Sequence, residues 1–326
     1  MNNRTINILY ILILFFISLS VFKVLMQIHN GHFQALVDAT YGVIKGQPHW
    51  IAYQNRLLGP YIVYFISKTG FPFHVALKIY ILCMVVFQNI LLFFLIRKMN
   101  VRRRESLGWV MLYCFAFIIV QHYWLYTWDS LDSIIFTLLA WGIFKAKSVY
   151  YFMILFCVAI LNRESALFVA LYIVIDAFHF KSIKEFYFVS VKKLLVGTSL
   201  ILLGSVYTKV IRHYLFVSKP NGQPDTAHEL IGNHIYLPQN LYNLFFYNAY
   251  STDIINSAFI VGSIFYFLFF VKSYSDTQIK ALLMFFAIIA NILIFGLINE
   301  TRMFIVLIPF VIFLLLSKEN LTNLST

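Results

Sequence analysis

The chain has 326 residues, of which 61% are hydrophobic and only 12% are charged, and its mean hydropathy is +0.81. Because about 25% of the residues of a typical soluble domain are charged, this composition excludes an ordinary soluble protein and predicts one that crosses a membrane several times. The net charge of +12 does not indicate nucleic acid as a partner, since membrane proteins gather excess lysine and arginine in their cytoplasmic loops.

A membrane-spanning helix needs about 20 apolar residues, although shorter spans occur. In chain order, the candidate spans are 6–26, 75–96, 107–124, 128–146, 149–161, 165–180, 193–216, 254–272, 279–298 and 302–317. The first segment is long for a signal peptide and lacks a small-residue cleavage site, so it is interpreted as an anchor that stays. We therefore predict an all-α, polytopic bundle of about ten transmembrane helices, with residues 1–326 forming a single transmembrane domain.

The distribution of charge orients these helices. The stretch "RKMNVRRRE" at 97–105 carries five basic residues and must be cytoplasmic. Alternating from there, fifteen lysines and arginines lie on the inner side and eight on the outer side, with both termini inside. Acidic residues show the opposite bias, and those on the outer side are Asp38, Asp129, Asp132, Glu164, Asp225, Glu229, Asp253 and Glu300.

Two long outer loops follow from this topology, at 27–74 and 217–253. The first contains the apolar stretch 57–67, whose eleven residues include Gly59-Pro60 and suit a surface or re-entrant helix better than a span. If that stretch crossed the membrane, the N-terminus would lie outside. The second loop carries His228, Glu229 and His234, but their spacing fits no strong metal template, so no metal is predicted.

Charged residues occur beside apolar segments in three separate stretches, and the topology puts all three on the outer side. "NRES" holds Arg163 and Glu164, "NETRMFIVLIP" holds Glu300 and Arg302, and "QNRLLGP" holds Arg56. Charges at membrane depth are costly and usually face a protein interior or a wet cavity. Arginine binds phosphate bidentately, and a nearby carboxylate can serve as a general base. The stretches therefore predict an anionic-substrate site.

Asp129 and Asp132 begin the fourth predicted helix and, being three residues apart, share one of its faces. Simpler interpretations stay open for each candidate. Asp129 and Asn162 are also suited to capping helix N-termini, the Arg–Glu neighbours to structural ion pairs, and Arg56 to snorkelling toward lipid headgroups. The aromatic residues Tyr123, Trp124, Tyr126 and Trp128 are typical of an interfacial belt.

The layout resembles the GT-C class of integral membrane glycosyltransferases, whose sugar donor is carried on a polyprenyl phosphate or pyrophosphate. The resemblance rests on a long outer loop after the first helix with an acidic residue in it, here Asp38 in "FQALVDATYGVIKGQPHW". The "NRES" and "NETRMFIVLIP" stretches are similar to outer-face motifs of bacterial surface-polysaccharide proteins. The chain departs from better-known members in lacking a large soluble domain after the last span. It also has Ala39 after Asp38, where many members carry a paired Asp-Glu.

The resemblance implies a glycosyltransferase in the bacterial cytoplasmic membrane that assembles a cell-surface glycan. Arg56, Arg163 and Arg302 would hold the donor's phosphate, oriented by Glu164 and Glu300, and Asp38 would be the base, with Asp129 or Asp132 in reserve. The partners are the bilayer, a polyprenyl-linked sugar donor and a glycan or lipid acceptor. No firm cofactor is indicated, and a divalent metal stays open as an alternative.

Three other functions remain open at this stage. A polymerase that joins lipid-linked repeat units would use the same arginines on the same face. A flippase or transporter for lipid-linked sugars would need a site near the bilayer midplane, often between inverted repeats, and no repeat is found. A structural subunit of a separate enzyme would tolerate replacement of the arginines.

Overall fold

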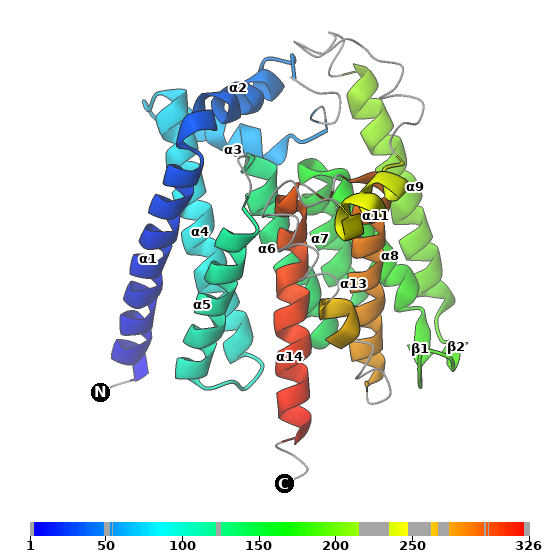
Figure 1. The fold of residues 1–326 in the computed structure, drawn as a ribbon. Coiled ribbons are helices and arrows are strands. Elements are labelled where there is room, and N and C mark those ends of the chain that lie inside the picture. Colours follow the sequence, from blue (N-terminus) through cyan, green and yellow to red (C-terminus); the bar gives the residue numbers. More distant parts are fainter. Residues whose placement is uncertain are drawn as a thin grey trace.

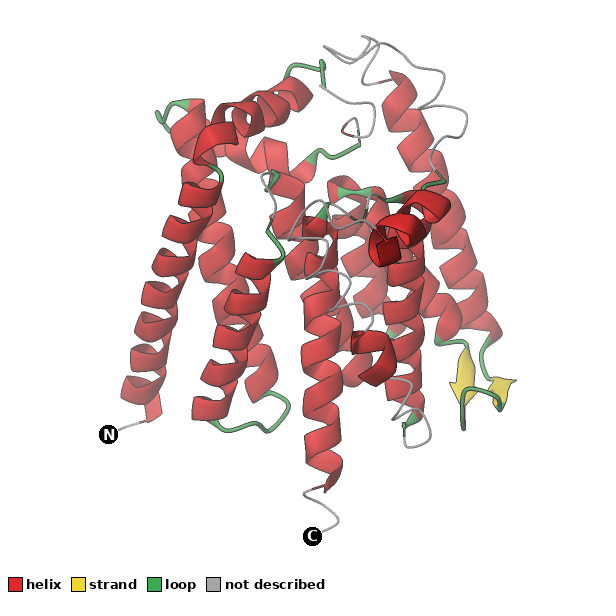
Figure 2. Cartoon of the chain, in the orientation of Figure 1, coloured by secondary structure: helices red, strands yellow, loops and turns green. Residues whose placement is uncertain are grey.

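The computed structural model describes residues 3–48, 53, 55–121, 125–214, 235–246, 262–266, 274–296, 298 and 300–322. Nearly all the regular structure in these residues is helical (Figure 2), which confirms the all-α prediction. The exception is one small antiparallel hairpin, in which Phe178 pairs with Phe188 and Phe180 with Phe186.

The helices differ in length and role. The longer elements of the bundle are α1 (Asn3–Ile28), α4 (Phe73–Arg97), α5 (Arg103–Ile119), α6 (Thr127–Phe144), α7 (Val149–Asn162), α8 (Leu167–Ile175), α9 (Val191–Tyr214), α13 (Asp276–Phe295) and α14 (Ile308–Thr322). The short elements are η1 (Asn30–His32), α2 (Phe33–Ile44), α3 (Leu58–Ser67), η3 (Glu164–Ala166), β1 (Phe178–Phe180), β2 (Phe186–Phe188), α11 (Leu237–Phe246) and η5 (Thr301–Leu307).

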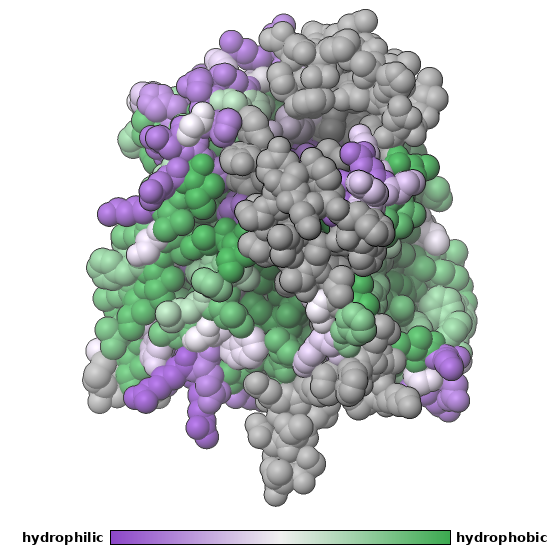
Figure 3. Space-filling view, in the orientation of Figure 1, coloured by the Kyte–Doolittle hydropathy of each residue, from purple (hydrophilic) through white to green (hydrophobic). Residues whose placement is uncertain are grey.

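Four helices in the described part of the chain are long and apolar enough to cross a membrane: Thr5–Ile28, Phe73–Arg97, Val191–Ile211 and Asp276–Phe295. Their neighbours expose large apolar side chains, such as Phe115 of α5 at 64% and Ile154 of α7 at 68%. The space-filling view shows apolar residues in a band across the middle of the molecule, with polar residues above and below it (Figure 3). The chain is therefore a membrane protein, because water would not tolerate so much exposed apolar surface.

The two ends of the bundle are distinct (Figure 1). At the end that is lower in the figure, here called the termini end, α1 begins, α14 ends and the β hairpin protrudes. The connections that carry Arg102–Arg104 and Lys145–Lys147 also lie there. At the other end, here called the site end, α2 and α3 lie across the top of the helices. The segments predicted to share the inner side thus share one end of the bundle.

The stretch predicted as a surface or re-entrant helix is helical, as α3 (Leu58–Ser67), and is shorter than the candidate spans. α3 begins with Gly59 and Pro60 in its first turn, where proline is tolerated because its missing N–H would be unpaired anyway. It approaches α6 closely: a Cβ on Gly59 would lie 2.8 Å from the Thr127 side chain. Only a residue without a side chain allows this contact, which fixes the first loop against α6.

The predicted span 165–180 is wrong in its last part. The helix ends at Ile175, and residues 178–180 form strand β1. The chain leaves the helix because the backbone N–H of Phe180 bonds to Asp276 of α13 and the N–H of Val189 bonds to the carbonyl of Ala177. Most of the predicted span 254–272 and of the outer loop 217–253 lies outside the described residues.

Candidate functional site

Segments far apart in the sequence converge at the site end of the bundle. They are the end of the first loop, the start of α6, the turn between α7 and η3, and the start of η5. A backbone hydrogen bond of 3.0 Å, from the Leu57 N–H to the Leu161 carbonyl, ties the first loop to the end of α7. The hydroxyl of Thr301 donates to the carbonyl of Val120 and ties η5 to the end of α5. These bonds help to bring together the three stretches that carry Arg56, Arg163 and Arg302.

Asp129 sits at the centre of the cluster and is only 6% exposed. One carboxylate oxygen accepts from the backbone N–H of Tyr126, which is the N-cap residue of α6, so Asp129 lies in the first turn of the helix and is not its N-cap. It also takes part in ion pairs, with Arg163 at 3.5 Å and with Arg302 at 3.6 Å. The sequence offered Asp129 as a helix N-cap or as a general base, and its carboxylate here bonds the start of α6 and pairs with two arginines.

Asp132, one helical turn further along α6, is 2% exposed and held from several sides. Arg163 lies 3.4 Å away, and the other carboxylate oxygen accepts from the Asn162 amide at 2.8 Å and the Ser165 hydroxyl at 3.1 Å. Asn162 was a candidate helix cap, but its amide instead reaches across to α6, where it also donates to the carbonyl of Trp128. Asp132 thus joins α6 to the α7–η3 turn.

Arg302, like Arg163, pairs with carboxylates of the cluster. Arg302 is 2.7 Å from Glu300, whose side chain is 37% exposed and is the most open of the carboxylates that pair with these arginines. Although burial opposes it, the charge of Arg302 lowers the pKa of Glu300 below its ordinary value, so the carboxylate stays ionised at neutral pH. Arg163 and Arg302 are therefore both neutralised by carboxylates.

An aromatic column runs beside these ion pairs. Tyr126 and Trp128 stack with ring centroids 4.6 Å apart, and the hydroxyl of Tyr53 donates to that of Tyr126 at 2.9 Å. Tyr126 and Trp128 are 6% and 0% exposed, so the predicted interfacial belt is wrong for these two residues. Tyr123 and Trp124, its other predicted members, lie outside the described residues.

The column separates two guanidinium groups. Arg302 lies 4.6 Å from the ring centre of Tyr126, and Arg56 lies 4.9 Å from that of Trp128 and 5.0 Å from that of Tyr53. Cation–π contacts of this kind gain strength when they are desolvated. The rings therefore hold Arg56 in place from one side without neutralising its charge.

Arg56 differs from the other two arginines. It is 6% exposed, yet among the described residues no carboxylate lies within ion-pair distance and no hydrogen bond involves its guanidinium. Burial, followed by the charge of Arg163, lowers its pKa to about 10, so it remains a cation at neutral pH. A buried charge without a partner is costly, and its usual justification is a ligand that supplies the opposite charge.

The net charge of the cluster does not by itself attract anions. Three arginines face four carboxylates, of which Glu164 accepts from the Asn55 amide at 2.7 Å. The sequence predicted that all three arginines hold a phosphate, but two of them are already paired with carboxylates. Arg163 and Arg302 organise the carboxylates, and Arg56 is the arginine whose charge is left for a ligand.

The structure does not bring Asp38 into this cluster. It is exposed on α2 and accepts a hydrogen bond of 2.9 Å from Gln34, one turn earlier on the same helix. It does lie at the site end, because α2 crosses the top of the bundle (Figure 1). Of the three candidate bases, Asp38 is the one that solvent and an acceptor can reach, since Asp129 and Asp132 are buried.

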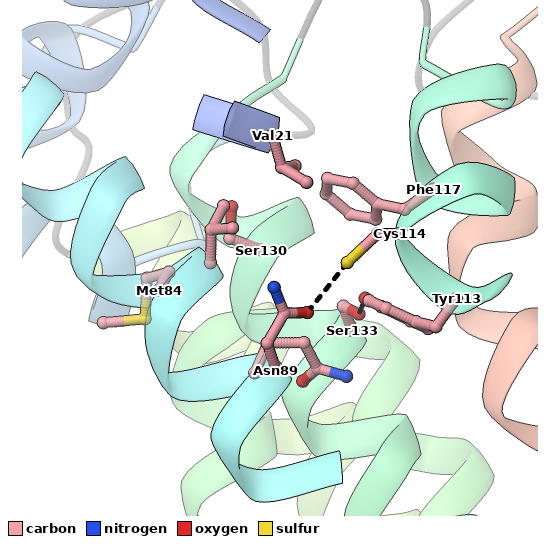
Figure 4. Close-up of a pocket in the computed structure, with 10 residues that line it drawn as sticks. Val21, Met84, Asn89, Tyr113, Cys114, Phe117, Ser130 and Ser133 are labelled. Atoms are coloured by element: carbon pink, nitrogen blue, oxygen red, sulfur yellow. Dashed lines mark hydrogen bonds between the residues drawn. The ribbon is translucent and has the colours of Figure 1, made fainter. Parts of the chain in front are cut away.

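A second cluster of polar side chains lies inside the bundle and carries no charged residue. Asn89 of α4 and Cys114 of α5 point toward each other, and the thiol donates to the amide oxygen at 3.3 Å (Figure 4). Asn89 also donates to Ser18 of α1, and the hydroxyls of Tyr113 and Ser133 are 2.5 Å apart. The adjoining cavity has a volume of about 10 Å³. This network joins α1, α4, α5 and α6, and the cavity is too small for a sugar.

No group of three or more metal-binding side chains has the arrangement of a metal site within the described ranges. The predicted loop residues His228, Glu229 and His234 lie outside those ranges. Comparison with known proteins adds no further constraint on the site. No protein-family model, curated protein or solved structure matches the chain.

Proposed function

We propose that this chain is a membrane glycosyltransferase. It takes a sugar from a polyprenyl-phosphate-linked donor at the outer face of a bacterial cytoplasmic membrane and transfers it during assembly of a cell-surface glycan. In this proposal the chain has about ten crossings in a GT-C-like arrangement, with both termini in the cytoplasm and the site end of the bundle outside.

The observation that carries the proposal is the unpaired Arg56. Its guanidinium is buried against Trp128 and Tyr53 with no carboxylate beside it in the described part of the chain. A planar guanidinium fixed in this way presents its N–H groups to a phosphate in a forked geometry. Phosphate is also the leaving group of a polyprenyl-linked donor, so the same contacts stabilise the charge that develops during transfer.

The surroundings of Arg56 support a lipid-linked rather than a soluble donor. The site lies at the end of an apolar bundle whose helices expose side chains suited to lipid. A polyprenyl chain can stay in the bilayer while its phosphate reaches the first loop. A soluble nucleotide sugar would need a broader cationic surface, whereas the arginines beside Arg56 are already neutralised by Asp129, Asp132 and Glu300.

The other residues then take distinct roles. Arg163 and Arg302 are positioning residues, which hold the carboxylates of α6 and η5 and so fix the aromatic column under Arg56. Asp38 accepts the proton from the acceptor hydroxyl, since a general base must be within reach of the substrate. Asp129 and Asp132 have their oxygens occupied by N–H and O–H donors and by arginines, and they serve the architecture of the site.

The test is mass spectrometry of polyprenyl-linked sugars in host cells that lack this gene, complemented with wild type or Arg56→Ala. We expect an intermediate to accumulate that can be labelled from outside the membrane. Wild type should clear it, and Arg56→Ala should not, although the variant reaches the membrane in normal amount. Lys68→Ala is the matched control, because Lys68 is also in the first loop and also lies over a tyrosine ring, Tyr64, but is exposed.

Other outcomes point to the remaining functions. An intermediate trapped on the inner side would indicate a flippase and overturn the proposal. Single units that reach the outer face but are never joined into chains would indicate a polymerase. If Arg56→Ala clears the intermediate as well as wild type does, Arg56 does not bind the donor.

The base is tested separately with Asp38→Asn, which keeps the shape and the hydrogen bond to Gln34. Transfer should be lost at normal expression, because the amide cannot accept a proton. An active Asp38→Asn protein would exclude this residue as the base and leave the phosphate-binding role of Arg56 untouched.

A further inference from the structure

The β hairpin is the feature of the fold that the proposed function does not use. Strands β1 and β2 protrude at the termini end of the bundle, beside the lower end of α9 (Figure 1). The hairpin is anchored to α13 at one edge, where Asp276 accepts from the Phe180 N–H at 2.7 Å. Phe180 also packs against the core of the bundle, whereas strand β2 is exposed along its length.

The two faces of the hairpin differ in composition. One face carries His179 and Tyr187, whose rings are 5.1 Å apart, and the imidazole of His179 lies 3.6 Å from Asp276. Because side chains alternate along a strand, the other face carries four phenylalanines in two cross-strand pairs. The ring centroids of Phe178 and Phe188 are 5.6 Å apart, and those of Phe180 and Phe186 are 5.7 Å apart.

This four-phenylalanine face has little protein over it. Phe186 is 59% exposed and Phe188 45%, while Phe178 and Phe180 are partly buried. A two-stranded hairpin is marginally stable in water unless its apolar face packs against something. The bundle holds the hairpin at one edge through Asp276 and leaves Phe186 and Phe188 open, so these rings are available to a partner outside the bundle.

Basic residues surround the same face. Lys181 and Lys184 are exposed in the turn between the strands, and neither forms an ion pair within the described residues. Lys192 follows the hairpin at the start of α9, with its ammonium 5.5 Å from the ring centre of Tyr150. Lysines beside exposed aromatic rings are the combination that recognises a layer of anionic lipid headgroups.

We propose that this hairpin is an interfacial anchor that binds anionic phospholipid headgroups at the termini end of the protein. The four phenylalanines enter the boundary between headgroups and acyl chains, where aromatic rings are favoured. Lys181 and Lys184 contact the phosphates from the aqueous side. The apolar band of the molecule ends near the end of the bundle that carries the hairpin (Figures 1 and 3), which suits a hairpin placed at the membrane surface.

The test measures the depth of a nitroxide label at Phe186→Cys, on the phenylalanine face, in a background of Cys83→Ser and Cys157→Ser, in which the remaining Cys114 is buried. Accessibility to oxygen, which concentrates in lipid, is compared with accessibility to a water-soluble nickel chelate. The protein is reconstituted in phosphatidylcholine alone or mixed with phosphatidylglycerol. We expect the label to move from the aqueous to the interfacial range when phosphatidylglycerol is present, and to move back at high salt.

Charge reversal supplies the specificity control. The double variant Lys181→Glu and Lys184→Glu should abolish the shift, whereas Lys145→Glu, an exposed lysine at the same end but outside the hairpin, should leave it intact. A label at the same depth in both lipids would overturn the proposal. A label inaccessible to both reagents would also overturn it, because the face would then be covered by protein.

Discussion

Two charged clusters lie at opposite ends of this bundle and are built differently. At the termini end, Lys280 lies 2.9 Å from Asp176 and 2.8 Å from Asp276, and Lys193 lies 2.5 Å from Asp176. At the site end, the arginines lie 3.4–3.6 Å from Asp129 and Asp132. The first cluster is based on lysine and has equal numbers of ammonium and carboxylate groups. The second is based on arginine and flanked by aromatic rings, and apart from the 2.7 Å pair of Arg302 with Glu300 its ion pairs are longer.

The difference also shows in which donors are left over. At the termini end, both ammonium groups pair with carboxylates, and the cluster joins the end of α8 to α9 and α13. At the site end, Nε of Arg56 and Nη1 of Arg302 are buried without a hydrogen-bond partner. We infer that the termini-end cluster, whose ammonium groups are all paired, stabilises the fold. The site-end cluster has N–H donors without partners, which a ligand can use. The predictions below test this distinction.

The largest loss of stability is expected for Lys280→Met. The side chain of Lys280 is 8% exposed, and its removal leaves Asp176 with one partner and Asp276 without its ammonium. Breaking a buried pair in this way costs about 3–5 kcal/mol. Thermal unfolding in detergent measures it, with Lys145→Met as the exposed control. A melting temperature equal to that of wild type would show that this cluster does not stabilise the fold.

A smaller loss is expected for Arg163→Met at the site end. Asp129 keeps Arg302, and Asp132 keeps the Asn162 amide and the Ser165 hydroxyl. We expect about 1–3 kcal/mol, the cost of leaving buried polar groups only partly satisfied. The same unfolding assay checks it, and a loss larger than that of Lys280→Met would invert the proposed contrast.

Gly59→Ala tests the packing that holds the first loop. The new Cβ would lie 2.8 Å from the side chain of Thr127 and 3.0 Å from its carbonyl carbon, which forces α3 away from α6. Overpacking of this kind costs about 1–3 kcal/mol. We expect sugar transfer to fall more than stability does, because Arg56 precedes α3 directly. Gly108→Ala in α5, where a Cβ meets nothing within 4 Å, is the control.

Arg56→Met is expected to change the free energy of unfolding least, and yet to abolish sugar transfer. No carboxylate in the described part of the chain loses an ion-pair partner, and a buried charge is replaced by an apolar side chain of similar length. The free energy of unfolding should stay within about 0.5 kcal/mol of wild type or rise. A loss of several kcal/mol would instead assign Arg56 to the structure of the fold.

Part of this arrangement could be predicted from the sequence. Charges are so costly beside apolar segments that Arg163, Glu300 and Arg302 stood out at once, and the topology placed them on one side with Arg56. Their pairing could not be predicted, because it depends on how α6, α7 and η5 meet in space. The caps of α6 and the role of Asn162 depend on the same contacts.

Two errors share a physical cause. The segment 178–180 was predicted as the end of a helix because "FHF" is as apolar as the helix before it, and its strand conformation follows from contacts with β2 and Asp276. Tyr126 and Trp128 were predicted to lie in an interfacial belt because aromatic residues near a span often do. They are buried because the first loop packs over them and supplies Tyr53 and Arg56. Local composition does not reveal such long-range contacts.

The bonds that close the site also set an order for its assembly. The first loop is fastened by Leu57 to Leu161 and by Asn55 to Glu164, a partner 109 residues further along the chain, and η5 is fastened to Val120 across 181 residues. During synthesis the N-terminal segment emerges long before those partners exist. The first loop can therefore pack into its final position only after the α7–η3 turn has been synthesised and lies beside it. Arg56 becomes a buried cation only at that late stage, so chains released early have an open first loop and lack the proposed ligand site.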